Sequence, residues 1–175
     1  MAHTTVDHQT RTQAVGELLD AGLHALAVSA ILHMDPRIVT NLKRSKQRLK
    51  AKGSRIPTMI ALAKDGVKWK EVGVLLNTYL SVADDPYNSI SADALIGATK
   101  IYQSIHSAMN DGVNQEWMLD ANAAFAIARE YRDGILKRVS CSDCKIKFAH
   151  LIRDLNPSAP ARCPVCNSKI SKKSC

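Results

Sequence analysis

The sequence predicts a mainly α-helical protein that carries a small C-terminal zinc module. Aromatic residues make up only 5% of the 175 residues, and Ala, Leu and Ile recur at helical spacings of three and four, which favours helices over strands. Two Cys-x-x-Cys pairs lie near the C-terminus. We therefore expect a helical body over residues 1–139, with a helix-turn-helix-like element inside it, and a zinc-binding module over residues 140–175.

The first part of the body is expected to contain one long helix and one basic helix. Apolar residues follow a single stripe over residues 12–33, which predicts a helix over that range. Asp35 supplies an oxygen for an N-cap, and Pro36 fixes φ at the first helical position. The basic helix is expected from Pro36 to Lys50 or Lys52, with Gly53 as the left-handed residue after its end.

The rest of the body is expected to be helical as well. Asp65-Gly66 is a turn signal, and the pair Asp85-Pro86 separates two further periodic segments. After the last segment the chain enters the cysteine region, so the boundary of the body is expected near residue 139. The apolar and periodic segments cover residues 59–63, 68–83, 91–109 and 115–138.

Composition excludes a membrane span and a secretory leader. The longest uncharged stretch, residues 21–34, is far shorter than the roughly 20 apolar residues that cross a bilayer. Residues 1–11 are polar and lack the apolar segment of a signal peptide. We therefore expect a cytoplasmic protein, in which five reduced cysteines favour metal ligation over disulfides.

The net charge of +8 is concentrated in two segments. Residues 37–55 contain eight Lys or Arg and no acidic residue, and residues 137–175 contain nine against two acidic residues. Together these segments carry +15, so the remainder carries −7. Such segregation is typical of surfaces that neutralise a polyanion, and both segments are expected to face DNA. The alternative is a pair of solvated basic helix faces.

The cysteine spacing predicts a structural zinc site. Eighteen residues separate the two Cys-x-x-Cys pairs, which is the spacing of four-cysteine zinc modules. Four thiolates close a tetrahedron and leave no open position for water or substrate, so one structural ion per chain is expected. The expected ligands are Cys141, Cys144, Cys163 and Cys166.

Other readings of the cysteines are weaker. A redox dithiol would lie near a βαβ pattern, and none is evident. A zinc deaminase would carry an H-x-E element, which is absent, and its proline would precede a pair, whereas Pro164 lies inside one. His150 could compete as a ligand, but a solvated loop histidine is the more common case. Cys175 is expected to be an incidental exposed thiol.

The basic helix divides into faces that suit a DNA major groove. An apolar stripe of Ile38, Leu42, Ser45 and Leu49 is expected to pack on the preceding helix. On the polar side, a row of arginine and amide groups can bind guanine and adenine, while a lysine row meets phosphates. The preceding helix, the turn over residues 32–35 and this helix predict a helix-turn-helix. The expected DNA-binding residues are Arg37, Thr40, Asn41, Lys43, Arg44, Lys46, Gln47, Arg48 and Lys50.

Basic amphipathic helices also bind RNA, acidic proteins or anionic lipids. The scarcity of aromatic residues argues against single-stranded RNA, which is bound on aromatic stacking platforms. Two competing functions remain: a zinc-ribbon RNA-binding or ribosome-associated protein, and a metalloenzyme. We expect a protein without enzymatic activity that binds double-stranded DNA.

The order of these features resembles the FlhC family, the C subunits of the bacterial flagellar master activator. The resemblance runs through Gly16-Glu-Leu-Leu, residues 35–53, Ala98-Thr-Lys-Ile-Tyr102 and Gly134-Ile-Leu, and is sharpest at Ser140-Cys-Ser-Asp-Cys144 and Phe148. It implies a hetero-oligomer with a small helical FlhD-like subunit and two C-type chains. This assembly would bind promoter DNA and activate transcription, with the four cysteines holding zinc and RNA polymerase as a further partner.

The chain extends only nine residues past Cys166, which is shorter than expected for flagellar members. In this respect it resembles the AcaC and SetC activators of conjugative plasmids and integrative elements. The resemblance therefore implies promoters of either flagellar or mobile-element transfer genes as targets.

Overall fold

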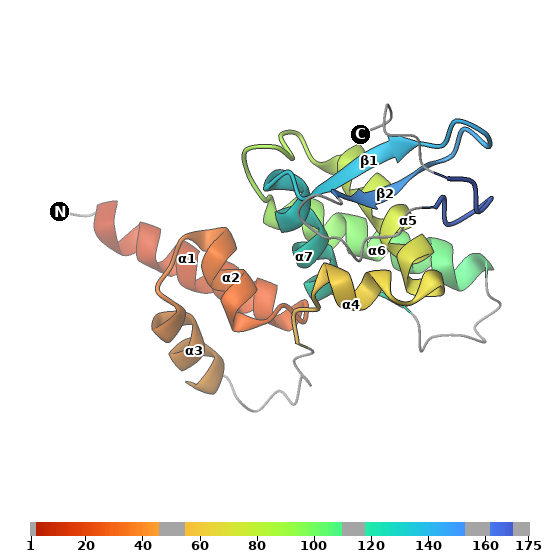
Figure 1. Cartoon of the computed structure of the whole chain (residues 1–175). Coiled ribbons are helices and arrows are strands. Elements are labelled where there is room, and N and C mark those ends of the chain that lie inside the picture. The colour runs from red at the N-terminus through yellow and green to blue at the C-terminus, as the bar shows by residue number, and fades with distance from the viewer. Residues whose placement is uncertain (1–2, 46–54, 110–117, 153–161, 170–175) are drawn as a thin grey trace. The chain divides into compact units, whose positions relative to one another are not determined.

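The computed structural model describes residues 3–45, 55–109, 118–152 and 162–169. Within these ranges the chain forms seven helices and one two-stranded antiparallel sheet, which confirms the expected mainly helical fold class (Figure 1). No helix in the described part of the chain is both long and apolar enough to cross a membrane. The chain divides into two compact units, Met1–Ile56 and Pro57–Cys175.

The first unit consists of α1 (His3–Asp20), α2 (Ala25–Leu32) and α3 (Pro36–Ser45), and each of these helices contacts the other two. The prediction of one helix over residues 12–33 was wrong. Gly22 adopts a φ of 87°, which ends α1, and the His24 side chain then caps α2 by accepting a hydrogen bond from the Leu26 N–H. The apolar stripe continues through both helices, so periodicity alone did not reveal the break.

A short turn fixes α3 on the end of α2. His33 adopts a left-handed φ of 51°, and the hydroxyl of buried Ser29 donates to the Met34 carbonyl at 2.6 Å. Asp35 Oδ1 accepts from the Arg37 N–H at 2.7 Å, which confirms the expected N-cap. The part of the expected helix beyond Ser45, including Lys50, Lys52 and Gly53, lies outside the described residues.

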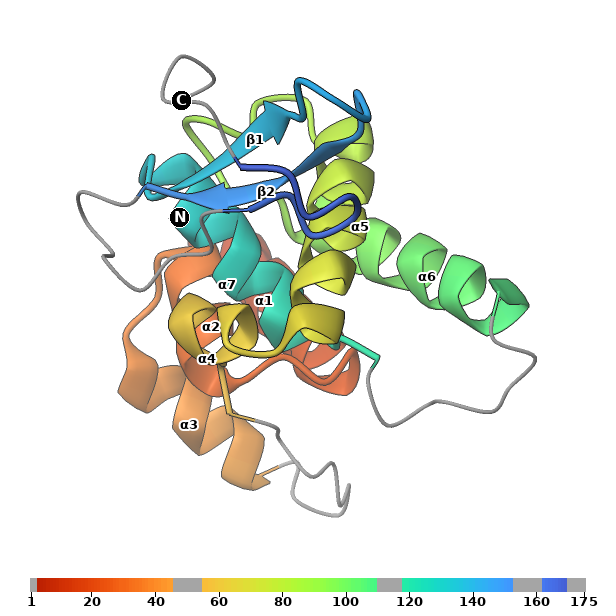
Figure 2. The same ribbon diagram turned by 45° about the vertical axis from the view of Figure 1, so that its right-hand side comes forward.

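The second unit is built around α5 (Gly66–Val82), which contacts α4 (Met59–Ala63), α6 (Ala92–Met109), α7 (Ala121–Arg132) and both strands (Figure 2). Leu75, Leu76 and Tyr79 are fully or almost fully buried along α5. Asp65 caps α5 by accepting from the N–H groups of Val67 and Lys68.

The sheet consists of β1 (Leu136–Ser140) and β2 (Lys147–Leu151). The prediction of one helix over residues 115–138 was wrong, because α7 ends at Arg132. Gly134 has a φ of 73°, and the N–H groups of Gly134 and Ile135 bond back to the carbonyls of Tyr131 and Glu130. This pattern is a Schellman C-cap, which turns the chain into β1. Residue 139, near which the end of the body is expected, lies within β1, and the chain divides into its two compact units between Ile56 and Pro57.

Candidate functional site

The two Cys-x-x-Cys segments form knuckles with the same backbone hydrogen bonds. In the first knuckle, residues 141–146, the Cys141 N–H donates to the Ile146 carbonyl at 3.0 Å, and the Lys145 N–H donates to the Cys141 carbonyl at 3.1 Å. In the second knuckle, residues 163–168, the corresponding bonds run from Cys163 to Ser168 at 2.8 Å and from Asn167 to Cys163 at 3.0 Å. The two loops are therefore structural repeats.

Each knuckle contains one residue in the left-handed region, directly after its second cysteine. Lys145 has a φ of 61° and Asn167 a φ of 63°. Glycine fits this conformation without strain, and asparagine tolerates it better than lysine. The same conformation therefore recurs at the same position of both loops, although only the second loop has a residue there that tolerates it well.

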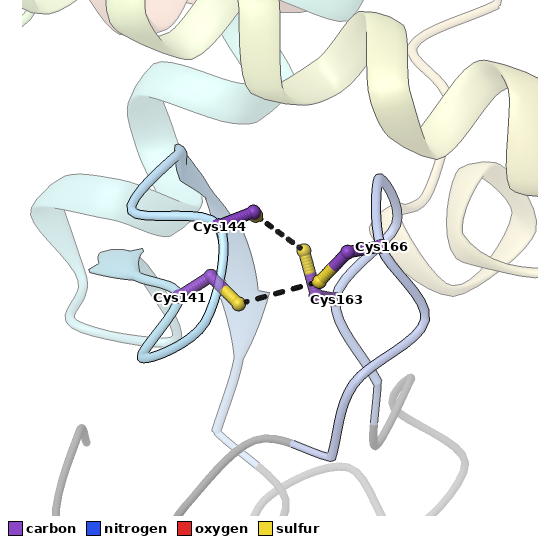
Figure 3. A group of neighbouring side chains, drawn as sticks. All are labelled: Cys141, Cys144, Cys163 and Cys166. Carbon is purple, nitrogen blue, oxygen red and sulfur yellow. Dashed lines mark hydrogen bonds between the residues drawn. The ribbon is translucent and has the colours of Figure 1, made fainter.

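The four sulfurs gather in one place, as Figure 3 shows. Cys141 Sγ lies 3.5 Å from Cys166 Sγ, and Cys144 Sγ lies 3.8 Å from Cys163 Sγ. All four sulfurs lie within 4.8 Å of one another. A tetrahedron with metal–sulfur bonds of about 2.3 Å has edges of about 3.8 Å, whereas a disulfide requires about 2.05 Å. The four cysteines are free, and their spacing fits a metal ion.

The protonation of the sulfurs also fits a cation. A hydrogen bond with Ser168 lowers the pKa of Cys166 to about 6. The Ile146 N–H lowers the pKa of Cys144, but loss of solvation and hydrogen bonds with the other three sulfurs raise it to about 12 overall. Neighbouring thiolates repel one another, so the four groups are not all ionised together without a compensating positive charge. A divalent metal ion supplies that charge.

Apolar packing supports the first knuckle within the second unit. Val139 and Phe148 form a buried cluster with Cys141 and Cys163. Where β2 crosses α5, a Cβ on Gly73 would lie 3.6 Å from the Ala149 nitrogen and 3.7 Å from the Phe148 Cα, so the strand lies directly against the helix. β2 is therefore packed closely on α5, and it carries Phe148 beneath the sulfurs.

Two further residues, His150 and Cys175, were considered in the sequence analysis as possible ligands or thiols. His150 is only 3% exposed in β2, so the expectation of a solvated loop residue was wrong, and it does not belong to the sulfur cluster. His150 lies two residues after Phe148 in β2, so both side chains are on the same face of the strand. Cys175 lies outside the described residues.

Ser168 and Gly73 are parts of the site that the sequence analysis missed. Ser168 Oγ lies 3.2 Å from Cys166 Sγ and also hydrogen-bonds Asp143 of the first knuckle, which lowers the pKa of that carboxyl. The sequences Cys-Ser-Asp-Cys-Lys-Ile-Lys and Cys-Pro-Val-Cys-Asn-Ser-Lys share a repeat that could have indicated matching loops. No sequence signal indicated the contact at Gly73.

The predicted arginine and amide row of α3 lies on its solvent side. Arg37, Asn41 and Arg44 are exposed, whereas Thr40 and Lys43 are half-buried. The Thr40 hydroxyl donates to the Pro36 carbonyl at 2.7 Å. Four of the expected DNA-binding residues lie outside the described residues, namely Lys46, Gln47, Arg48 and Lys50.

The predicted packing stripe of α3 was wrong. Val39 is the completely buried residue, and Ile38 is 49% exposed. α3 contacts both α1 and α2, so the buried position faces the space between these helices. Ile38 instead lines an open cavity of about 640 Å³ beside α1, together with Arg11, Thr12, His33, Met34, Asp35, Asn41, Leu42 and Ser45.

The fold and the site thus define a mainly helical protein with a cluster of four cysteines that could hold a metal ion, and with a basic surface helix. Comparison with protein-family models and with curated proteins finds no match.

Proposed function

We propose that this protein is the DNA-binding subunit of a transcriptional activator, with α3 lying in the major groove of double-stranded DNA. The observation that carries this proposal is the position of the basic row relative to the core. Steps of 100° per residue place Val39 about 200° from Arg37, whereas Asn41 and Arg44 lie within about 60° of one another around Arg37. Because Val39 is completely buried, Arg37 and Arg44 lie on the solvent side of α3, and Asn41 is exposed at the open cavity beside them.

The chemistry of the row favours base recognition. Guanidinium groups bind guanine and an amide binds adenine in the major groove, so Arg37, Asn41 and Arg44 combine both kinds of contact. No acidic residue occurs in α3 (Pro36–Ser45), so the helix does not repel a phosphate backbone. The caps at His33 and Asp35 hold the helix in a fixed orientation on α2.

Zinc is the metal that we propose for the four cysteines, as Zn²⁺ takes closed tetrahedral thiolate sites in small modules. Cys141, Cys144, Cys163 and Cys166 would hold it. The ion would supply folding energy and no catalytic chemistry, because no coordination position remains for a substrate. This closed donor set supports a binding protein over a metalloenzyme.

The resemblance to the FlhC family supports a hetero-oligomeric activator. In this proposal the chain pairs with a small helical FlhD-like subunit, two C-type chains occur per complex, and the complex activates flagellar or mobile-element transfer promoters together with RNA polymerase. Two recognition helices in such a complex would fit a pseudo-palindromic site.

The test is site selection from a random duplex pool, followed by affinity measurements on Arg44→Ala at a stated salt concentration. The variant should lose about 1 to 3 kcal/mol of discrimination at one base position. Lys43→Ala, which removes a half-buried lysine about 100° around the helix from Arg44, should weaken all duplexes alike. Equal loss on selected and random duplexes for Arg44→Ala would contradict the face assignment. Tighter binding to structured RNA at the same salt would favour the ribosome-associated alternative.

A further inference from the structure

The β-hairpin of the second unit carries a pair of exposed cations on one face. Arg138 lies opposite Ala149 in the ladder, and Ser140 lies opposite Lys147. Arg138 and Lys147 are therefore diagonal cross-strand neighbours on the same face, with backbones about 7–8 Å apart. Both side chains are exposed. We call these two residues the hairpin cation pair.

The hairpin cation pair is not neutralised within the described part of the chain. Carboxylates in the segment that precedes the hairpin have other partners: Glu130 binds Arg129 at 2.8 Å, and Asp133 binds Arg132 at 2.9 Å. Asp143 accepts a hydrogen bond from Ser142 at 3.0 Å. Two exposed cations on one face, without a carboxylate partner in the described residues, leave this face positively charged, which suits an external anion.

The pair is held on a rigid support. The Asn77 side chain of α5 donates to the Lys147 carbonyl at 3.1 Å, and Gly73 lets β2 lie directly against the same helix. The strands end at the first knuckle, which begins at Cys141. The backbone that carries the pair is therefore held in place, so only the two side chains have to be ordered when they meet a ligand.

Two tyrosine hydroxyl groups lie at the Arg138 end of the hairpin cation pair. Burial raises the pKa of Tyr131 to about 12, and the charge of Arg138 opposes that shift, which places Arg138 near this ring. The Tyr131 hydroxyl donates to the Tyr87 hydroxyl at 2.8 Å, and Tyr87 is 66% exposed. Cations beside a phenol hydroxyl match the phosphate oxygens of nucleic acids, which accept from Arg, Lys and Tyr.

We propose that Arg138 and Lys147 form a second contact with duplex DNA, through its phosphates, separate from the contact made by α3. This inference rests on the proposed function, because that function makes DNA the polyanion. In this proposal the pair contributes affinity and no base preference, because contacts to phosphates carry no sequence information.

The test compares two double variants of the full chain, prepared with any copurifying partner. Arg138→Ala/Lys147→Ala removes the hairpin cation pair. Lys70→Ala/Lys100→Ala removes two equally exposed cations from α5 and α6 of the same unit, so both variants have the same net charge. Affinity for the selected duplex and for a random duplex is measured across a salt series, with metal content and thermal unfolding as controls on folding.

In the Arg138→Ala/Lys147→Ala variant, the slope of log affinity against log salt should be less negative by about 1.8, because each phosphate contact contributes about 0.9 to the slope. When salt is raised from 50 to 200 mM, the factor by which the affinity falls should then be about 12-fold smaller for the variant than for the unmodified protein. The loss should be equal on both duplexes, the Lys70→Ala/Lys100→Ala variant should keep the original slope, and Arg138→Lys/Lys147→Arg should restore it.

Three results would overturn the inference. A hairpin variant that behaves like the Lys70→Ala/Lys100→Ala variant, while Arg44→Ala still alters base preference, rejects the second contact and leaves the proposed function intact. A loss confined to the selected duplex with an unchanged slope would assign the pair to bases. If the unmodified protein binds structured RNA or heparin as tightly as duplex DNA at the same salt, the proposed function itself fails, and the inference fails with it.

Discussion

The two knuckles of the metal site have the same backbone but different attachments. The first knuckle continues directly from β1 into β2, and this hairpin lies against α5. In the described part of the chain, the bridge between Arg162 and Lys169 closes the second knuckle on itself. This knuckle is tied to the first through the sulfur contacts and through the hydrogen bond between Ser168 and Asp143. Similar local geometry therefore has two different sources of stability.

The first knuckle draws its stability from the helical unit. Val139 is 5% exposed and Phe148 is 3% exposed, and the strand ladder supports both. Cys163 also enters this apolar cluster, but it is the only described residue of the second knuckle that does so. A bound metal would therefore act mainly as a cross-link that fastens the second knuckle to a prefolded first knuckle.

The largest expected effect comes from removal of the metal. A strong chelator, or Cys163→Ser, should abolish binding of one ion per chain, and structural zinc in small peptides contributes about 10–16 kcal/mol at pH 7. In hydrogen exchange, the amides at positions 163 and 167 should lose protection, while those of Cys141 and Lys145 should retain most of theirs. The helical content measured by circular dichroism should stay nearly constant.

A matched control for that experiment is Cys175→Ser, which alters a thiol outside the four-cysteine cluster and should keep the metal. If both knuckles lost their amide protection together on chelation, the first knuckle would be no more prefolded than the second, and the contrast drawn from their attachments would be incorrect.

A smaller effect is expected at the two left-handed positions. Lys145→Gly should stabilise the metal-bound protein by about 0.5–1 kcal/mol, because glycine removes the strain of a positive φ and this gain exceeds the added entropy of the unfolded chain. Asn167→Gly should change stability by less, because asparagine already tolerates the conformation. Chemical denaturation in the presence of excess metal measures both.

Lys145 also donates from its ammonium group to the Ser142 carbonyl at 2.6 Å, an exposed contact that Lys145→Ala removes without relieving the backbone. That variant should be neutral or slightly destabilising. If Lys145→Ala were as stabilising as Lys145→Gly, the side chain would be responsible for the effect, and φ would not.

The sequence predicted the cysteine cluster well because two short spacings determine it. A Cys-x-x-Cys loop fixes its own geometry, and the four cysteines that gather were correctly grouped from spacing alone. The N-cap at Asp35 was also predictable, because it depends on residues within one turn. Local chemistry therefore accounts for the features that sequence analysis located correctly.

Features that depend on distant contacts were missed. Gly22 and Gly134 end helices inside segments whose apolar periodicity continues. Each end is set by a positive φ, and the presence of a glycine does not by itself predict that conformation. The buried face of α3 is centred on Val39 because two other helices meet it, which no periodicity within α3 could indicate. The position of β2 depends on the missing side chain of Gly73, 76 residues before Ala149.

The smallest expected effect distinguishes the knuckles by the acidity of their thiols. In metal-free, reduced protein, the pKa of Cys166 is lowered to about 6 by its hydrogen bond with Ser168, whereas the pKa of Cys144 is raised to about 12. Above about pH 6 the second knuckle therefore presents a thiolate, while the first retains a thiol at neutral pH. Alkylation at pH 7, followed by peptide mass spectrometry, should modify Cys166 much faster than Cys144.

Ser168→Ala removes the hydrogen bond that favours the thiolate, so the pKa of Cys166 should rise by about one unit or more toward its ordinary value, and the midpoint of its alkylation profile should move to higher pH. Ser142→Ala is the matched control, because the Ser142 hydroxyl bonds Asp143 and no sulfur. Since protons compete with metal for a sulfur, Ser168→Ala should also make metal affinity fall more steeply as the pH decreases from 8 to 6. An unchanged alkylation profile in Ser168→Ala would mean that the acidity of Cys166 comes from the neighbouring cysteines, and the second knuckle would then owe its reactive thiolate to the cluster rather than to its own loop.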